Sequence, residues 1–214
     1  MTRKAWALAL TSLALAACST VPTTSPTAGQ TLVCEPLLSK SANCVRHIEA
    51  LDAFAAAQMP SWGMGGRAAI THGKQSGSLG VEWEDAGSSG YLVTLTAPIT
   101  RQGWRLQERD GRATLEGMAG GPRNGADGAD LLRQATGFEI PVRALRYWIR
   151  GLADPSQPVG RYVFADDRLA TLVQDGWQID FLARDGQGRP SRINAARGGD
   201  RVRLVIDRWG PLKQ

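Results

Sequence analysis

The sequence has little histidine and little cysteine, with two histidines and three cysteines in 214 residues. A metal site built from several histidines is therefore excluded, unless cysteines or carboxylates complete it. The formal net charge is only +5, which is too weak and too scattered to indicate nucleic-acid binding. Charged residues make up 21% and hydrophobic residues 43%, and these values argue against a wholly disordered chain. The length fits one domain better than two.

Common catalytic motifs are also missing. Residues 77–80 and 87–90 resemble a Gly-x-Ser-x-Gly nucleophile motif only superficially, and we interpret both as turns. Residues 63–66 lack the third glycine of a dinucleotide-binding loop, because Ala68 stands in its place. Gly73-Lys74 is followed by glutamine, so there is no P-loop. These absences argue against an enzyme.

The titratable residues form no catalytic pattern in the sequence. We predict ordinary surface or packing roles for His47, which falls on a predicted helix, and for His72 at a strand end. Asp166-Asp167 is interpreted as a turn between two strands and not as an acid/base pair. We therefore predict that the chain has no catalytic residue.

The first 18 residues indicate export and lipid attachment. Arg3 and Lys4 precede 13 mostly apolar residues, 5–17, which are too few to span a bilayer but match a signal-peptide core. The run ends in Leu15-Ala16-Ala17-Cys18, which resembles a bacterial lipobox. This resemblance implies cleavage before Cys18, a diacylglycerol on its thiol and acylation of its new amine. The alternative is a plain secretory signal followed by a chance cysteine.

We therefore divide the chain into three parts. Residues 1–17 are the predicted signal peptide, 18–30 are the lipidated cysteine with a flexible tether rich in Ser, Thr and Pro, and 31–214 are the folded domain. Ser19 after the lipidated cysteine is compatible with sorting to the outer membrane. The predicted location is the outer membrane, with the chain anchored through Cys18 and facing the periplasm.

Two roles are open for Cys34 and Cys44. Because the periplasm is oxidising, we expect a disulfide that closes a short loop before the first helix. The alternative is a metal site that adds His47 and His72. The Cys-x9-Cys-x2-His spacing matches no standard zinc pattern, so we predict no metal site.

The predicted domain consists of strands around short helical segments. Apolar spacing predicts a helix over residues 42–58, ended by Pro60. Beyond it, apolar residues recur at every second position, which predicts about ten strands in antiparallel sheet with one side in water. The alternating sets are Leu79, Val81 and Trp83; Tyr91, Val93 and Leu95; Trp104 and Leu106; Ala113 and Leu115; Trp177, Ile179 and Phe181; Val202, Leu204 and Ile206.

Two short helices are predicted within residues 126–151, one around Leu131 and Leu132 and one from Val142 to Ile149. Helices inserted among strands indicate a curved sheet with a helical lid. A barrel of this strand number has an interior larger than side chains alone fill, and an apolar interior would hold a hydrophobic ligand. The alternative is that the same residues interdigitate in a solid core.

Several blocks of sequence resemble the LolB family, outer-membrane lipoproteins that receive other lipoproteins. Residues 136–152, TGFEIPVRALRYWIRGL, are similar to that family's TG-x-x-(I/L)-P-x-x-x-L-x-x-W-(I/L)-x-G stretch. With the lipobox, the resemblance covers nearly the whole chain, and its specificity lies in the order and combination of the blocks. The other similar blocks are Gly66-Arg67, residues 95–99, Asp175-Gly176-Trp177 and residues 204–209.

The resemblance implies a mainly β fold, an unclosed antiparallel β-barrel of about 11 strands with an α-helical lid. It implies a cavity for acyl chains, no cofactor and no covalent chemistry. The implied partners are a LolA-type periplasmic carrier, the acyl chains of lipoprotein cargo and outer-membrane phospholipid, with no nucleic acid, and we expect a monomer. From the alternation and the resemblance, the predicted cavity lining is Trp83, Trp104, Leu106, Trp148, Trp177 and Ile179.

One position is expected to act in delivery to the membrane. In the family, an exposed apolar residue on a loop after the third strand helps to place the lipoprotein in the membrane, and the matching block puts Pro98 and Ile99 there. The family usually has leucine followed by glycine, whereas this chain has Ile99-Thr100, which keeps the apolar character but not the flexible glycine. The alternative is that Ile99 packs inside.

Two other classes of function stay open from the sequence. One is an outer-membrane-anchored periplasmic hydrolase of envelope glycans or lipids, whose pocket would hold convergent polar groups, whereas a carrier's pocket would be almost wholly apolar. The other is a structural lipoprotein with a filled core. Seven late arginines either attract an acidic carrier or anionic head groups or simply keep outer strand faces solvated: Arg184, Arg189, Arg192, Arg197, Arg201, Arg203 and Arg208.

Overall fold

The computed structural model describes residues 31–38, 41–57 and 61–210. The predictions for the signal peptide, Cys18 and the tether therefore lie outside the described residues. The helices are α1 (Ala42–Ala57), α2 (Gly128–Thr136), α3 (Val142–Trp148) and a short 3-10 turn, η1 (Gly87–Ser89). The strands are β1 (Thr31–Cys34), β2 (Trp62–His72), β3 (Gln75–Asp85), β4 (Tyr91–Thr96), β5 (Gly103–Arg109), β6 (Arg112–Glu116), β7 (Arg123–Gly125), β8 (Val159–Ala165), β9 (Arg168–Gln174), β10 (Trp177–Arg184), β11 (Pro190–Arg197) and β12 (Asp200–Trp209).

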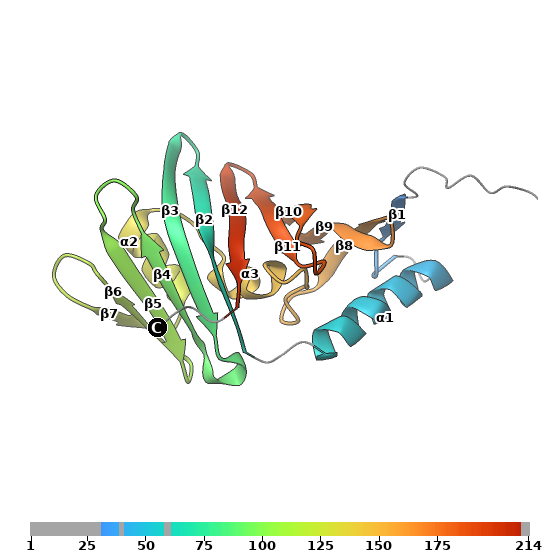
Figure 1. The fold of residues 1–214 in the computed structure, drawn as a ribbon, viewed down its shortest axis with the longest axis horizontal. Coiled ribbons are helices and arrows are strands. Elements are labelled where there is room, and N and C mark those ends of the chain that lie inside the picture. The colour runs from blue at the N-terminus through green and yellow to red at the C-terminus, as the bar shows by residue number, and fades with distance from the viewer. Residues whose placement is uncertain (1–30, 39–40, 58–60, 211–214) are drawn as a thin grey trace, which may run out of the picture.

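The strands form one antiparallel sheet that stays open. Its order is β1-β8-β9-β10-β11-β12-β2-β3-β4-β5-β6-β7, so β1 and β7 are the two edges (Figure 1). The predicted mainly β, unclosed antiparallel architecture is confirmed, with twelve strands in the described residues where about eleven were expected. None of the helices in this part of the chain has the length and hydropathy that crossing a membrane requires.

Three of the hairpins turn on aspartates in the left-handed conformation. Asp110-Gly111, Asp166-Asp167 and Asp175-Gly176 each have two consecutive positive φ angles, between 49° and 71°. Two-residue turns of this kind match the right-handed twist of the strands that they join. Asp166-Asp167 is therefore a turn, as predicted. Residues 77–80 are not a turn, because they continue inside β3 and pair there with β2.

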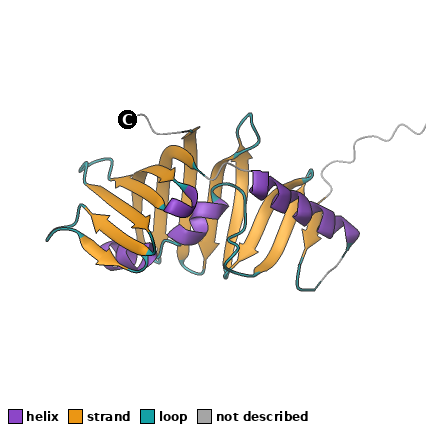
Figure 2. Cartoon of the chain, turned by 90° about the horizontal axis from the view of Figure 1, so that it is seen from below, coloured by secondary structure: helices purple, strands orange, loops and turns teal. Residues whose placement is uncertain are grey.

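The helices lie along the sheet at different places (Figures 1 and 2). α2 packs against β5 to β7 and contacts α3, whereas α1 lies at the opposite end beside β1. The side chain of Asp127 accepts a hydrogen bond from the N–H of Ala129 at 2.7 Å and begins α2, and Gly137 with φ 75° ends it. Two short helices within residues 126–151 and one helix from residue 42 are thus observed, as predicted.

Alternating side chains supply the hydrophobic core. Val93, Leu106 and Leu204 are examples of inward residues that are at most 4% exposed.

A close approach of two backbone segments limits the size of the side chain at position 66. At Gly66, which pairs with Ile206 beside a bulge in β12, a Cβ atom would lie 2.1 Å from the carbonyl oxygen of Val205.

A disulfide fastens the first strand to the first helix. Cys34 at the end of β1 and Cys44 in α1 are bonded, with their Cα atoms 5.5 Å apart, and both are almost fully buried. These two sulfurs are therefore engaged with each other. Among the described residues there is no group of three or more Cys, His, Asp and Glu side chains that could hold a metal ion.

Candidate functional site

Five of the six predicted lining residues lie in the packed core. Trp83, Leu106, Trp148, Trp177 and Ile179 are at most 3% exposed, and Trp104 is half-buried. The rings of Trp148 on α3 and Trp177 on β10 are 6.0 Å apart. Alternation placed the strand residues of this set on the inner face, but none of the six lines the pocket described below. Their contact with acyl chains stays a prediction.

Two of the inner tryptophans have an unsatisfied polar atom. The buried Nε1–H groups of Trp83 and Trp177 find no hydrogen-bond acceptor among the described residues, and neither does that of Trp62. By contrast, the Nε1–H of Trp148 donates to Oε1 of the buried Gln174 at 2.9 Å. An unpaired buried donor costs about 1–3 kcal/mol, so the inner face is not optimised for stability at these positions.

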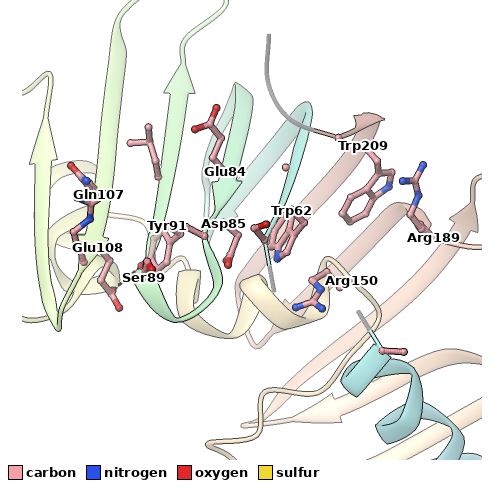
Figure 3. A pocket seen from close by; sticks show the side chains of 18 of the residues that line it. Trp62, Glu84, Asp85, Ser89, Tyr91, Gln107, Glu108, Arg150, Arg189 and Trp209 are labelled. Atoms are coloured by element: carbon pink, nitrogen blue, oxygen red, sulfur yellow. Dashed lines mark hydrogen bonds between the residues drawn. The ribbon is translucent and has the colours of Figure 1, made fainter. Parts of the chain in front are cut away.

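A pocket of about 1000 Å³ opens at one end of the central strands, where β2 begins and where β3 and β12 end (Figure 3). Tyr91 and Glu108 lie at one side and Trp209 and Arg189 at the other, with Trp62 and Asp85 between them. The lining is mixed, not the almost wholly apolar lining expected of a carrier. It consists of Phe54, Ala57, Ser61, Trp62, Gly63, Glu84, Asp85, Ala86, Ser89, Gly90, Tyr91, Leu92, Gln107, Glu108, Arg109, Arg150, Gln187, Arg189, Trp209 and Gly210.

Arginines and tryptophans form a continuous row along this pocket. The guanidinium carbon of Arg150 lies 6.0 Å from the ring centre of Trp62, and that of Arg189 lies 5.4 Å from Trp209. The two rings are themselves 5.8 Å apart. Burial lowers the pKa of Arg150, but a guanidinium stays charged at neutral pH. Both cations are thus held against aromatic faces.

Two of the three carboxylates that line the pocket, Asp85 and Glu108, are engaged in contacts within the protein. Asp85, 4% exposed, accepts hydrogen bonds from Nε and Nη2 of Arg146 on α3 and from the N–H of Gly87. The hydroxyl of Tyr91 donates to Glu108 at 2.9 Å. Burial, and then the charge and hydrogen bond of Glu108, raise the pKa of Tyr91, so it is a neutral donor. These groups therefore stabilise the pocket wall.

Neither histidine belongs to this pocket. Nε2 of His47 lies 3.1 Å from Asp167, and Nδ1 of His72 lies 2.5 Å from Asp200. The lining therefore pairs no serine with a histidine base, and no specific observation favours the hydrolase alternative.

The predicted insertion loop lies between β4 and β5. Ile99 is 93% exposed and Pro98 is exposed as well, so Ile99 does not pack inside. The loop is closed by hydrogen bonds from the N–H of Ala97 to the carbonyl of Gln102, at 2.9 Å, and from the N–H of Arg101 to the carbonyl of Ala97, at 3.0 Å. The loop therefore exposes the apolar side chain of Ile99 although Thr100, and not a glycine, follows it.

The late arginines do not act as one surface. Arg192, Arg201 and Arg203 are exposed. Arg184 is half-buried and donates to the carbonyl oxygens of Gly188 and Leu169, at 3.0 and 2.6 Å. The others are paired: Arg189 with Asp185, Arg197 with Glu139 and Asp175, and Arg208 with Glu82.

Sequence reasoning missed the pocket residues Trp62, Tyr91, Arg150 and Trp209. Arg150 and Trp209 stand inside blocks that had been singled out, and Tyr91 inside an alternating strand. Their convergence depends on the sheet order, which brings the start of β2 beside the end of β12. That pairing joins residues more than 140 positions apart, and no local pattern reports it.

Comparison with known proteins identifies the family. The family model described as "Outer membrane lipoprotein LolB" matches residues 60–209. The chain belongs to the LolB family. An outer-membrane lipoprotein LolB of Xanthomonas campestris pv. campestris is 39% identical over 213 residues, covering 94% of this chain and 95% of that protein. One of Xanthomonas oryzae pv. oryzae is 41% identical over 160 residues, covering 71% of this chain and 73% of that protein.

A more distant similarity is to a solved structure. A LolA superfamily protein from Nitrosomonas europaea has a TM-score of 0.46 and 10% identity, covering 78% of this chain and 94% of that chain. The LolB match itself spans β2 to β12, so it includes every residue that lines the pocket except Phe54 and Ala57 of α1 and Gly210.

Proposed function

We propose that this chain is the outer-membrane acceptor that receives lipoproteins from a LolA-type periplasmic carrier and inserts them into the membrane. The observation that carries the proposal is the LolB match over residues 60–209, which coincides with an unclosed sheet whose inner face is apolar. The acyl chains of the cargo lie against that inner face, between the sheet and the α2–α3 segment. The chain performs no catalytic step and needs no cofactor.

The size of the acyl chains explains why a relay is needed. Three chains carry roughly 40–45 CH₂ groups, and at about 0.8 kcal/mol each their exposure to water costs on the order of 30 kcal/mol. Free diffusion across the periplasm is therefore excluded. Transfer from one protein to another needs no ATP if the acceptor binds the cargo more tightly than the donor, since a difference in affinity is enough to move it.

The proposed attachment to the membrane is through Cys18, with the domain facing the periplasm. A triacylated cysteine is a stable anchor, because one chain alone gives only reversible binding. The twelve residues 19–30 would span at most about 40 Å when extended, so the domain works close to the membrane surface, as a monomer, and passes its cargo to outer-membrane phospholipid.

The decisive experiment follows the cargo. A LolA-type carrier loaded with labelled lipoprotein is mixed, without ATP, with the mature chain carrying Cys18→Ala, and the two proteins are separated. We expect the label to leave the carrier and to co-purify with this chain. If the label stays on the carrier at every ratio of the two proteins, the acceptor function is wrong.

A further inference from the structure

The pocket meets the hydrophobic core at Trp62. This half-buried ring lines the pocket and lies 5.8 Å from the ring of Trp83, which is 3% exposed and belongs to the core. Trp209, 5.8 Å from Trp62, extends the aromatic surface along the pocket toward Arg189. A ligand lying over these rings would have one end at the apolar interior and the other end among charged groups (Figure 3).

The charged groups of the pocket are balanced. Three arginines and three carboxylates line it. Asp85 is taken up by Arg146, and Glu108 by the hydroxyl of Tyr91. A balanced pocket gives no net attraction to a strongly charged ligand, and it suits a neutral one with hydrogen-bonding groups.

Two arginines stand where such a ligand would need donors. Arg189 is held by Asp185, with N–O distances of 2.8 and 2.7 Å, while its guanidinium carbon lies over Trp209. Arg150, two residues beyond the end of α3, lies over Trp62. Guanidinium groups only donate, so each matches an acceptor such as a carbonyl oxygen. Tryptophan with arginine is also the combination that suits a boundary between polar and apolar surroundings.

We propose that this pocket is a subsite for the polar head of the cargo, the acylated N-terminal cysteine. Its glyceryl-ester and N-acyl amide carbonyls accept hydrogen bonds from Arg150 and Arg189, and the first carbons of the acyl chains pack on Trp62 and Trp209. The inference rests on the proposed function, since it takes the cargo to be acylated. It adds selectivity for a neutral head with several carbonyl groups, because a free fatty acid has no ester or amide and brings a charge to which the balanced pocket gives no net attraction.

The test compares three probes: a synthetic triacylated cysteinyl lipopeptide, free palmitate and a diacyl phospholipid. Binding to the mature chain carrying Cys18→Ala is followed by tryptophan fluorescence. In the double variant Arg150→Gln/Arg189→Gln we expect the lipopeptide Kd to rise by about tenfold or more, since each arginine would lose a charge-assisted hydrogen bond. The palmitate Kd should stay within about twofold, and the phospholipid Kd should rise less than the lipopeptide Kd, because the phospholipid shares the glyceryl esters but lacks the N-acyl amide. Unchanged palmitate binding also shows that the variant folds.

A matched control removes the same charge elsewhere. Arg201 and Arg203 are exposed on β12, and neither lines the pocket, so Arg201→Gln/Arg203→Gln should leave all three affinities unchanged. If the double pocket variant does not fold, Arg189→Gln alone should weaken lipopeptide binding by about tenfold.

Each other result overturns the inference in a recognisable way. Unchanged lipopeptide binding in the pocket variants means that the arginines do not hold the head. Equal losses for lipopeptide and palmitate mean that they only shape the acyl-chain site. A loss for the phospholipid as large as that for the lipopeptide assigns the pocket to membrane lipid instead. If the unchanged chain binds none of the probes, the proposed acceptor function fails as well.

Discussion

Ile99 is 93% exposed at the tip of the β4–β5 loop, although it is a large apolar residue. Because folding removes almost none of this side chain from water, it contributes little to stability. An apolar side chain held out on a closed loop is well suited to enter a lipid surface.

We predict that Ile99→Glu leaves folding and acceptance from the carrier intact but lowers insertion of cargo by tenfold or more. Replacing an apolar by an acidic side chain costs about 3–4 kcal/mol at the centre of a transmembrane helix, and less than half of that cost corresponds to a tenfold effect. The measurement is the fraction of labelled lipoprotein that becomes membrane-bound in vesicles, with Ile99→Leu as the control that retains insertion. Normal insertion by Ile99→Glu would remove this residue from the delivery step.

Position 66 requires glycine because of a steric contact and not because of a turn. A Cβ atom there would lie 2.1 Å from the carbonyl oxygen of Val205, whereas a Cβ at Gly77 would meet nothing within 4 Å. We predict that Gly66→Ala destabilises the fold by about 1–3 kcal/mol and lowers the Tm. Gly77→Ala, the matched control in the neighbouring strand, should change the stability by less than about 0.5 kcal/mol. Equal Tm values for the two variants would contradict the steric explanation.

Single residues also show how far the sequence predicts the structure. Alternation located Trp83 and Trp177 on the inner face correctly, because side chains of a strand point to opposite faces in turn. It does not say whether an inner face encloses a space or packs solidly, since that depends on how side chains from distant strands and helices interdigitate. The same limit applies to Gly66, whose block was noted but whose neighbour, Val205, lies 139 positions away.

At the scale of elements, α3 is fastened to the β3–β4 turn by a charged contact. Arg146 donates to both carboxylate oxygens of Asp85 and to the carbonyl oxygen of Gly87. The Asp85 side chain is 2% exposed and that of Arg146 is 22% exposed. This contact raises the pKa of Arg146 mainly through its hydrogen bond with Asp85.

We predict that Asp85→Asn destabilises the chain by about 2–4 kcal/mol, because it leaves a half-buried cation without its counter-charge. Asp130→Asn removes the exposed partner of Arg133 and should cost less than about 0.5 kcal/mol. Chemical denaturation of both variants measures the difference. Hydrogen exchange of α3 should rise in Asp85→Asn only. Indistinguishable stabilities would mean that the contact does not fasten α3.

Elements differ in how far the sequence predicts them. The helices and the strands β3, β4, β5, β6, β10 and β12 were predictable, because their apolar periods are regular, whereas the long strand β2 shows no such alternation in the sets given above. The edge strands were not predictable either. β7 is Arg-Asn-Gly, and β1 has one buried residue, Cys34. Both strands form by backbone pairing with a neighbouring strand, β8 for β1 and β6 for β7. The disulfide to α1 also holds β1 in place.

At the scale of the whole molecule, the two edge strands influence whether copies of the chain associate with each other. Edge strands present unpaired backbone groups that another chain can extend, and short edge strands limit this risk. β1 has four residues and β7 three. We therefore predict that the mature chain carrying Cys18→Ala is a monomer in solution, as light scattering coupled to size exclusion would show. A stable dimer at micromolar concentration would contradict this expectation.

The two free edges of the sheet, β1 and β7, have a mechanical consequence. In a closed barrel the circumference is fixed by a full ring of backbone hydrogen bonds, so the lumen cannot widen unless some of them break. Here the two ends of the strand order are not joined to each other. The width of the space that the curved sheet encloses is therefore set by side-chain contacts and by the helices beside the sheet. We therefore expect the sheet to spread slightly around a bulky ligand and to close again when the ligand leaves.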